Sequence, residues 1–123
     1  SDVSIKDLVN NHRSGDNIVT ITSVNPGSRF GTLAIEGNQV NSFKEKQKES
    51  NGWINGGFMA MNKNVFDFLE NDDTILEKDP FEKISFIGKM GCHKHSGFWQ
   101  CMDTLRDKTY LESLIKENKA PWI

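Results

Sequence analysis

The chain has 123 residues, a length that fits one small domain able to bury a hydrophobic core without disulfide or metal support. Its hydrophobic fraction of 36%, charged fraction of 26% and net charge of −2 are typical of a soluble globular protein. With this net charge, no basic field points to nucleic acid or to an anionic membrane. No apolar run is long enough to span a membrane, and residues 1–10 show no signal peptide.

The first quarter of the chain predicts a helix followed by a buried strand. Ser4 and Asp7 fit a capping box, and apolar residues at helical spacing extend the helix over residues 4–13. Residues 17–24 (NIVTITSV) are rich in β-branched side chains, which favours a short buried strand. Residues 25–28 (NPGS) predict the loop that ends it.

A hairpin and a further strand follow in the middle of the chain. Residues 32–35 and 39–43 flank a turn at Gly37 and Asn38, the arrangement of a two-residue β-hairpin. Residues 44–52 are polar and of mixed charge, which predicts a loop, and a strand is expected over residues 53–61.

The remaining elements are helical except for one strand. Short helical periodicity covers residues 64–70, and residues 79–82 (DPFE) predict a helix start with Asp79 as N-cap, ending near Gly88. A strand over residues 90–96 and a last helix over 105–118 complete the chain. The order α, β, ββ, β, α, α, β, α predicts a single α/β domain over residues 1–123 with some antiparallel pairing.

Two cysteines and two histidines lie close together in the sequence. Cys92, His93, His95 and Cys101 could suggest zinc, but their spacing matches none of the usual ligand patterns. On a strand, His93 and His95 share a face and Cys92 points to the other. We therefore interpret the histidines as partly exposed strand residues and the cysteines as reduced thiols of a cytoplasmic protein.

Two polar segments have both a structural and a functional interpretation. Glu45 and Lys46 are either solvated loop charges or residues that bind sugar hydroxyls and a phosphate. Residues 55–57 (NGG) are either a simple bulge or a place where a ligand lies against bare backbone, with the Asn55 amide both donating and accepting.

Asp103 lies where a strand-like stretch meets the last helix. It could be the N-cap of that helix, or a ligand of a hard cation such as magnesium. Thr104 and Asp107 form a capping box of their own, which leaves Asp103 one residue outside the helix. The pattern alone leaves both roles open.

Four motifs together resemble the glucose-1-phosphate cytidylyltransferases, a group of the sugar-phosphate nucleotidyltransferases. They are residues 29–31 (RFG), 43–46 (FKEK), 53–58 (WINGGF) and 95–107 (HSGFWQCMDTLRD). The resemblance covers nearly the whole chain and implies the C-terminal half of a Rossmann-like mixed sheet with flanking helices and a β-hairpin. It also implies attack of the glucose 1-phosphate oxygen on the α-phosphate of CTP, which makes CDP-glucose for polysaccharide biosynthesis and releases pyrophosphate.

The resemblance assigns expected roles to five residues. Asp103 would be one of two aspartates that hold Mg²⁺, and Glu45 and Lys46 would bind the sugar and its phosphate. Asn55 would bind a sugar hydroxyl, and Gly31 would let the sugar approach the backbone.

The chain departs from the family pattern in two ways. Gln47 stands where the family usually has a proline, which should loosen the loop modestly. The glycine-rich nucleotide loop and the second metal-binding aspartate do not occur, and the latter would fall just upstream of Ser1. We therefore expect a fragment that binds CTP only with the missing half and is inactive alone. It would self-associate through exposed edges and apolar faces. The alternative is a non-enzymatic sugar-phosphate-binding or assembly module that needs a separate N-terminal partner.

Overall fold

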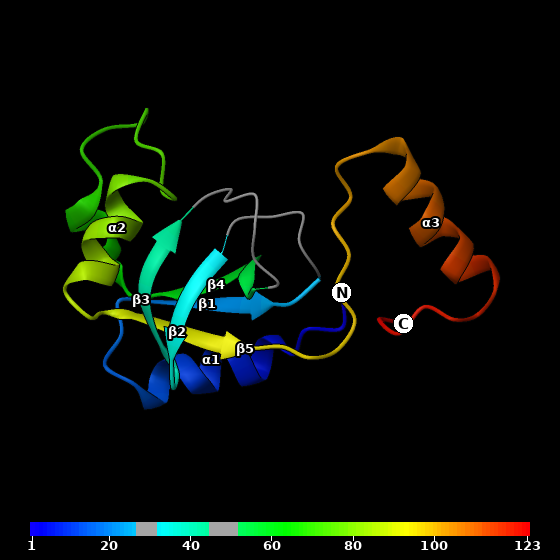
Figure 1. Ribbon diagram of the computed structural model, residues 1–123, viewed down its shortest axis with the longest axis horizontal. Coiled ribbons are helices and arrows are strands. Elements are labelled where there is room, and N and C mark those ends of the chain that lie inside the picture. The colour runs from blue at the N-terminus through cyan, green and yellow to red at the C-terminus, as the bar shows by residue number, and fades with distance from the viewer. Residues whose placement is uncertain (27–31, 45–51) are drawn as a thin grey trace. The chain divides into compact units, whose positions relative to one another are not determined.

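The computed structural model describes residues 1–26, 32–44 and 52–123 (Figure 1). These residues form two compact units, which we describe separately. The sheet unit comprises Ser4–His95, and the C-terminal unit comprises Ser1–Val3 with Ser96–Ile123. That all 123 residues form a single domain stays a prediction.

The described residues of the sheet unit form two α-helices, one 3-10 helix and five strands in a single mixed sheet. The elements in chain order are α1 (Ile5–Ser14), β1 (Val19–Val24), β2 (Thr32–Glu36), β3 (Gln39–Lys44), β4 (Ile54–Met61), η1 (Lys63–Phe68), α2 (Asp79–Phe86) and β5 (Met90–Lys94). The strand order is β2-β3-β5-β1-β4. β1 runs parallel to β5 and antiparallel to β4, and β3 runs antiparallel to β2 and β5. The predicted α/β class, mixed sheet and hairpin are confirmed.

β1 is the central strand, and all six of its residues are buried. Its side chains alternate between the two faces of the sheet, as they must in an extended chain. Thr20 faces α1, whose His12 ring bonds the Thr20 hydroxyl at 2.8 Å. Ile21 faces the other way and packs with Phe81 of α2 in one apolar cluster. The two helices therefore cover opposite faces, and Figure 1 shows them on opposite sides of the sheet.

The apolar core lies between the sheet and α2. Its fully or nearly fully buried members are Val19, Ile21, Val40, Val65, Phe81, Ile84, Met90 and Cys92. The opposite face, beneath α1, is more polar, since His12, Thr20 and Thr22 are all buried there. Burial of apolar side chains on one face and the His12–Thr20 hydrogen bond on the other help to hold the sheet between its two layers. The buried Thr22 Oγ1 has no hydrogen-bond partner among the described residues.

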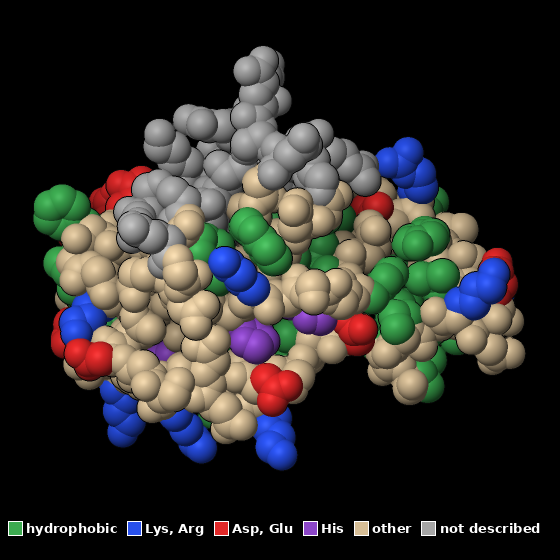
Figure 2. Space-filling model, turned by 60° about the horizontal axis from the view of Figure 1, so that its bottom comes forward, with side chains coloured by type: hydrophobic (Ala, Val, Ile, Leu, Met, Phe, Trp, Pro, Cys, Tyr) green, Lys and Arg blue, Asp and Glu red, His purple; other side chains and the backbone are tan. Residues whose placement is uncertain are grey.

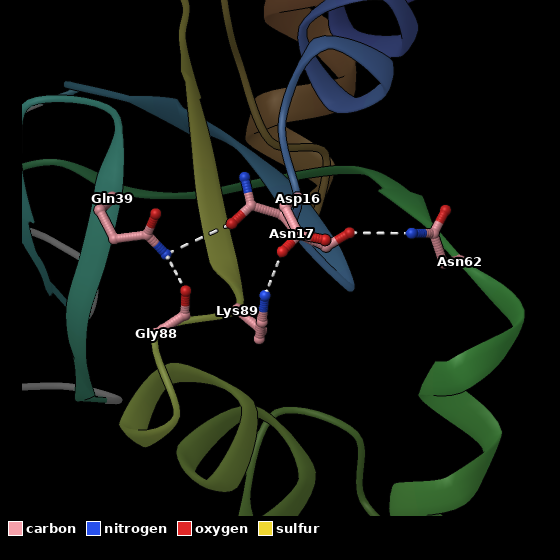
Figure 3. Close-up of polar contacts among 6 residues, drawn as sticks. All are labelled: Asp16, Asn17, Gln39, Asn62, Gly88 and Lys89. Atoms are coloured by element: carbon pink, nitrogen blue, oxygen red, sulfur yellow. Dashed lines mark hydrogen bonds and ion pairs between the residues drawn. The ribbon is translucent and has the colours of Figure 1, made fainter.

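A polar cluster joins four segments at the end of the sheet where β1 begins (Figure 3). The Asn62 Nδ2 donates to the Asn17 carbonyl at 2.9 Å, which ties the end of β4 to the start of β1. The Gln39 Nε2 donates to the Gly88 carbonyl at 3.0 Å and to the Asn17 Oδ1 at 3.4 Å. These side-chain amides connect loops that are far apart in the sequence and so help to set where the strands start.

The local signals at the turns and helix starts are mostly confirmed. Gly37 takes φ 62° at the first position of the hairpin turn, a conformation that favours glycine. The Ser4 hydroxyl caps α1 by accepting from the Asp7 amide. The prediction that Asp79 is the N-cap of α2 is wrong, because the Lys78 carbonyl already accepts from the Glu82 amide. The helix therefore begins one residue earlier, with Asp79 inside its first turn.

The C-terminal unit is built around α3 (Leu105–Lys116) and two extended segments. The Phe98 and Trp122 rings pack with centroids 5.2 Å apart, and the Phe98 carbonyl accepts from the Asp2 amide at 3.2 Å. Leu111 and Leu114 of α3 are half-buried. Hydrophobic side chains also gather on the surface of this unit (Figure 2). One helix is thus too little to cover the apolar side chains that this unit carries.

Candidate functional site

The structure describes two of the five residues expected to form a site. Asn55 lies in the sheet unit and Asp103 in the C-terminal unit. Gly31, Glu45 and Lys46 lie outside the described residues. Their expected roles stay predictions, and each described residue is considered within its own unit.

Asn55 lies near the start of β4, opposite Ser23 of β1. Its Oδ1 accepts from the Gly57 amide at 2.8 Å, and Gly57 takes φ 87°. The register moves from the pair Ile21 and Met59 to the pair Ser23 and Asn55, so residues 56–58 stand opposite one residue of β1. The bulge interpretation is therefore correct. The hydrogen bond from the Gly57 amide to Oδ1 also fixes the orientation of the Asn55 side-chain amide, and so fixes where its Nδ2 donor lies.

The place of Asn55 in the sheet is one that favours ligand binding. β1 and β5 run parallel, so the carboxyl ends of both strands lie at the same end of the sheet. β4 is antiparallel to β1 and begins at that end of the sheet, where Asn55 pairs with Ser23. Ser23 also pairs with Lys94 of β5, so Asn55 and Lys94 lie on either side of Ser23. In open α/β sheets, ligands bind beyond the carboxyl ends of parallel strands. We call this region, defined by Ser23, Trp53, Asn55 and Lys94, the strand-end region.

Lys94 and Trp53 form a contact in the strand-end region that sequence reasoning missed. The Lys94 Nζ lies 5.8 Å from the centroid of the Trp53 ring. This distance is within the range of a cation–π interaction. The two residues are 41 positions apart by their numbers, so only the pairing of β1 with both β4 and β5 brings them together. No short-range sequence signal marks such a pair.

Cys92, His93 and His95 lie along β5 and just beyond it. The buried Cys92 thiol contacts the Ser23 hydroxyl at 3.0 Å, and burial raises the Cys92 pKa. His93 is half-buried, and burial lowers its pKa, opposed by the charge of Asp7. Over residues 1–26, 32–44 and 52–123, no three His, Cys, Asp or Glu side chains gather as a metal site would require. The two histidines are partly exposed, as the strand interpretation expected.

Asp103 stands immediately before the N-cap of α3. Thr104 is that N-cap, and its hydroxyl accepts from the Asp107 amide at 3.2 Å. The Asp107 carboxylate in return accepts from the Thr104 amide at 3.0 Å, so the predicted capping box is present. Asp103 is exposed and does not cap the helix. The helix-cap role is thereby excluded for Asp103, which is an exposed residue directly before the helix start.

Two neighbouring groups define the electrostatics around Asp103. The Cys101 thiol has a raised pKa, chiefly because of partial burial and then because of the Asp107 and Asp103 charges. The Asp107 pKa is lowered, first by the hydrogen bond from the Thr104 hydroxyl at 2.8 Å. Cys101 is therefore a protonated thiol at neutral pH. Asp107 is a structural carboxylate that accepts the hydrogen bonds of the helix N-cap.

Comparison with known proteins agrees with the resemblance drawn from the motifs. A protein named glucose-1-phosphate cytidylyltransferase in Salmonella typhi is 43% identical over 122 residues, which span 99% of this chain and 48% of that protein. A probable glucose-1-phosphate cytidylyltransferase of Bacillus subtilis is 29% identical over 123 residues, again 99% of this chain and 48% of the relative. The resemblance is thus confirmed, and the chain spans about half the length of the relatives it matches, corresponding to their C-terminal half.

A solved structure shares the fold. It is provisionally assigned as a glucose-1-phosphate thymidylyltransferase of Bacillus anthracis and is in complex with a sucrose. The TM-score is 0.70 at 16% identity, over 97% of this chain and 50% of that one. No family model matches the chain. In the part of the chain that the structure describes, no helix is long and apolar enough to cross a membrane.

Proposed function

We propose that this chain is the sugar-phosphate-binding half of a glucose-1-phosphate cytidylyltransferase. It would take part in making CDP-glucose and pyrophosphate from CTP and glucose 1-phosphate once residues outside these 123 supply the nucleotide site. The observation that carries the proposal is 43% identity along 99% of the chain to a protein of that name. The match spans the positions of all four motifs, since it covers 122 residues.

The proposed sugar-phosphate site combines the strand-end region with the loop residues. Asn55 offers an amide whose orientation is fixed by its bond to the Gly57 backbone, which suits a sugar hydroxyl that both donates and accepts. We assign the sugar and its phosphate to Glu45 and Lys46, and close backbone approach to Gly31, on the motif match. These residues bind and orient the sugar phosphate so that a phosphate oxygen can attack a nucleotide.

Magnesium is the proposed cofactor, with Asp103 as one of its two protein ligands. The exposed carboxylate fits this role because it lies outside the helix cap and is a hard oxygen donor. Mg²⁺ keeps several waters and is commonly held by only one or two carboxylates. When bound, the ion would neutralise charge on the phosphates. The second carboxylate would come from outside these 123 residues.

The cellular setting follows from the same proposal. We place the chain in the cytoplasm, where both Cys92 and Cys101 would stay reduced, and both are free in the structure. The product would serve the synthesis of surface polysaccharides. Nucleic acid and membranes are not among the proposed partners.

The proposal is tested by complementation. Pyrophosphate release from CTP and glucose 1-phosphate with Mg²⁺ would be measured for this chain, for the unmatched half of the Salmonella typhi relative, and for the two mixed. We expect turnover only in the mixture. The Asp103→Asn mixture should lose about 100-fold in kcat because a metal ligand is removed.

Asp16→Asn is the matched control for Asp103→Asn, since Asp16 is also exposed and pairs with Lys89 away from the strand-end region. Turnover by the chain alone would contradict the half-site proposal. No turnover in the mixture, combined with binding of glucose 1-phosphate that Lys46→Ala abolishes, would favour the non-enzymatic binding module instead.

A further inference from the structure

We infer that Lys94, held over the ring of Trp53, is an additional phosphate-binding residue for the sugar phosphate. The inference rests on the proposed function, and it adds a second cation to the one that the motifs assign to Lys46. It is drawn from the placement of Lys94 in the sheet, because no motif pointed to this residue.

The sheet register places Lys94 beside the proposed sugar ligand. Ser23 of β1 pairs with Asn55 on one side and with Lys94 on the other. Because neighbouring strands lie about 4.8 Å apart, the Asn55 and Lys94 Cα atoms are roughly 10 Å apart. Residues paired across strands point to the same face, so both side chains project from one face. A hexose phosphate can lie between an amide and an ammonium so arranged.

The contact with Trp53 keeps the Lys94 ammonium in position without neutralising it. A cation over an aromatic face is attracted by the ring, yet it retains its charge and its hydrogen-bond donors. The Lys94 side chain is exposed, and among the described residues no carboxylate lies within ion-pair distance of it. A phosphate is the natural partner of such a group, because Lys binds phosphate as a point charge.

A purely structural role for the pair gives different expectations. If the Lys94 contact only secured Trp53 at the start of β4, removing the charge would lower the stability of the fold and leave ligand affinity unchanged. The phosphate-binding role predicts weaker ligand binding by the folded variant, in addition to the small loss of stability from the cation–π contact. Thermal unfolding and ligand titration of the same variants therefore separate the two.

The experiment is calorimetric titration of the purified chain with glucose 1-phosphate, for wild type, Lys94→Gln and Lys94→Arg. We expect Lys94→Gln to bind about tenfold more weakly, as expected for loss of one charge-assisted hydrogen bond, with a Tm lowered only slightly by loss of the cation–π contact. Lys94→Arg keeps the charge and the stacking on Trp53 and should retain most of the affinity.

Lys89→Gln is the matched control. Lys89 directly precedes β5, at the opposite end of that strand, and contacts Asp16, so the variant changes net charge equally at a remote place. Its affinity should equal that of wild type. Equal affinity of wild type and Lys94→Gln would overturn the inference and leave the proposed function standing. If wild type itself does not bind glucose 1-phosphate, the proposed pocket fails and the inference fails with it.

Discussion

Individual residues in this chain have environments that their neighbours in sequence do not reveal. Gly91 is an example, since it lies within β5 and takes no left-handed conformation. A Cβ at this position would lie 2.4 Å from the Asn17 Nδ2 and 3.1 Å from the Thr20 Oγ1. A glycine is therefore needed for space, because the side chains of β1 and of the loop before it approach the β5 backbone.

We predict that Gly91→Ala lowers the free energy of unfolding by about 1–3 kcal/mol, the usual effect of overpacking a buried site. Urea denaturation followed by circular dichroism measures this. If the cause is the clash with Asn17, the same substitution should cost less in an Asn17→Ala background. An equal cost in both backgrounds would show that the clash is not the reason.

The buried histidine of α1 is a second case at this scale. The Asn62 amide is oriented by its bond to the Asn17 carbonyl, so its Oδ1 accepts from the His12 Nε2 at 3.0 Å. The His12 Nδ1 then accepts from the Thr20 hydroxyl at 2.8 Å. His12 is thus a satisfied structural residue, because both of its ring nitrogens have hydrogen-bond partners.

Among the elements, α3 shows how strongly local signals act. Its capping box was predicted from Thr104 and Asp107 alone, and both reciprocal bonds are present. Such signals are reliable because their partners are three residues apart and need no other part of the fold. The error at Asp79 arose because turn residues ahead of α2 extend the helical hydrogen bonding to Lys78. The short helix predicted over 64–70 is the 3-10 helix η1, which begins at Lys63.

We predict a pH dependence that belongs to this cap. The Asp107 pKa lies below its ordinary value of 3.8, because the ionised carboxylate accepts bonds from Thr104. The carboxylate therefore stabilises the fold fully above pH 3.8, and this contribution is lost as the pH falls through the lower, folded-state pKa. Denaturant unfolding at pH 5 and pH 3 should show Asp107→Asn losing less stability on acidification than wild type.

The variant Thr104→Ala provides the matched comparison for the cap. It removes the hydroxyl that is the first cause of the lowered Asp107 pKa and keeps the backbone bond. We expect about 1 kcal/mol less stability at pH 5, the usual cost of losing an N-cap. Its loss between pH 5 and pH 3 should fall between those of wild type and Asp107→Asn. A loss equal to that of wild type would contradict the role given to this hydroxyl.

For the whole molecule, several large apolar side chains of the described residues are exposed to solvent. The C-terminal unit exposes Leu105 by 78% and Met102 by 63%, and Phe86 at the end of α2 is 89% exposed. β2 and β4 are the outer strands of the described sheet. Exposed apolar side chains and open strand edges promote association.

We predict that the chain self-associates, so that light scattering gives a mass above 14.0 kDa that rises with concentration. Leu105→Lys and Phe86→Lys should lower this mass by placing charge in the apolar surface. Glu112→Gln, at an exposed position of α3, changes the net charge by the same +1 without placing a charge in the apolar surface, and so controls for charge. A monomer at every concentration used would contradict the prediction.

The sequence by itself determined the features that depend on neighbouring residues or on a repeating hydrophobic pattern. β-branched runs, cap residues and the hairpin turn specified nearly all elements and the α/β class, and the motif strings pointed to the family that the comparisons support. The tertiary structure alone decided which residues meet. Strand pairing brings Lys94 to Trp53 and places it near Asn55, and packing leaves little room for a side chain at Gly91. Such contacts between distant residues depend on the sheet register, so no local sequence pattern predicts them.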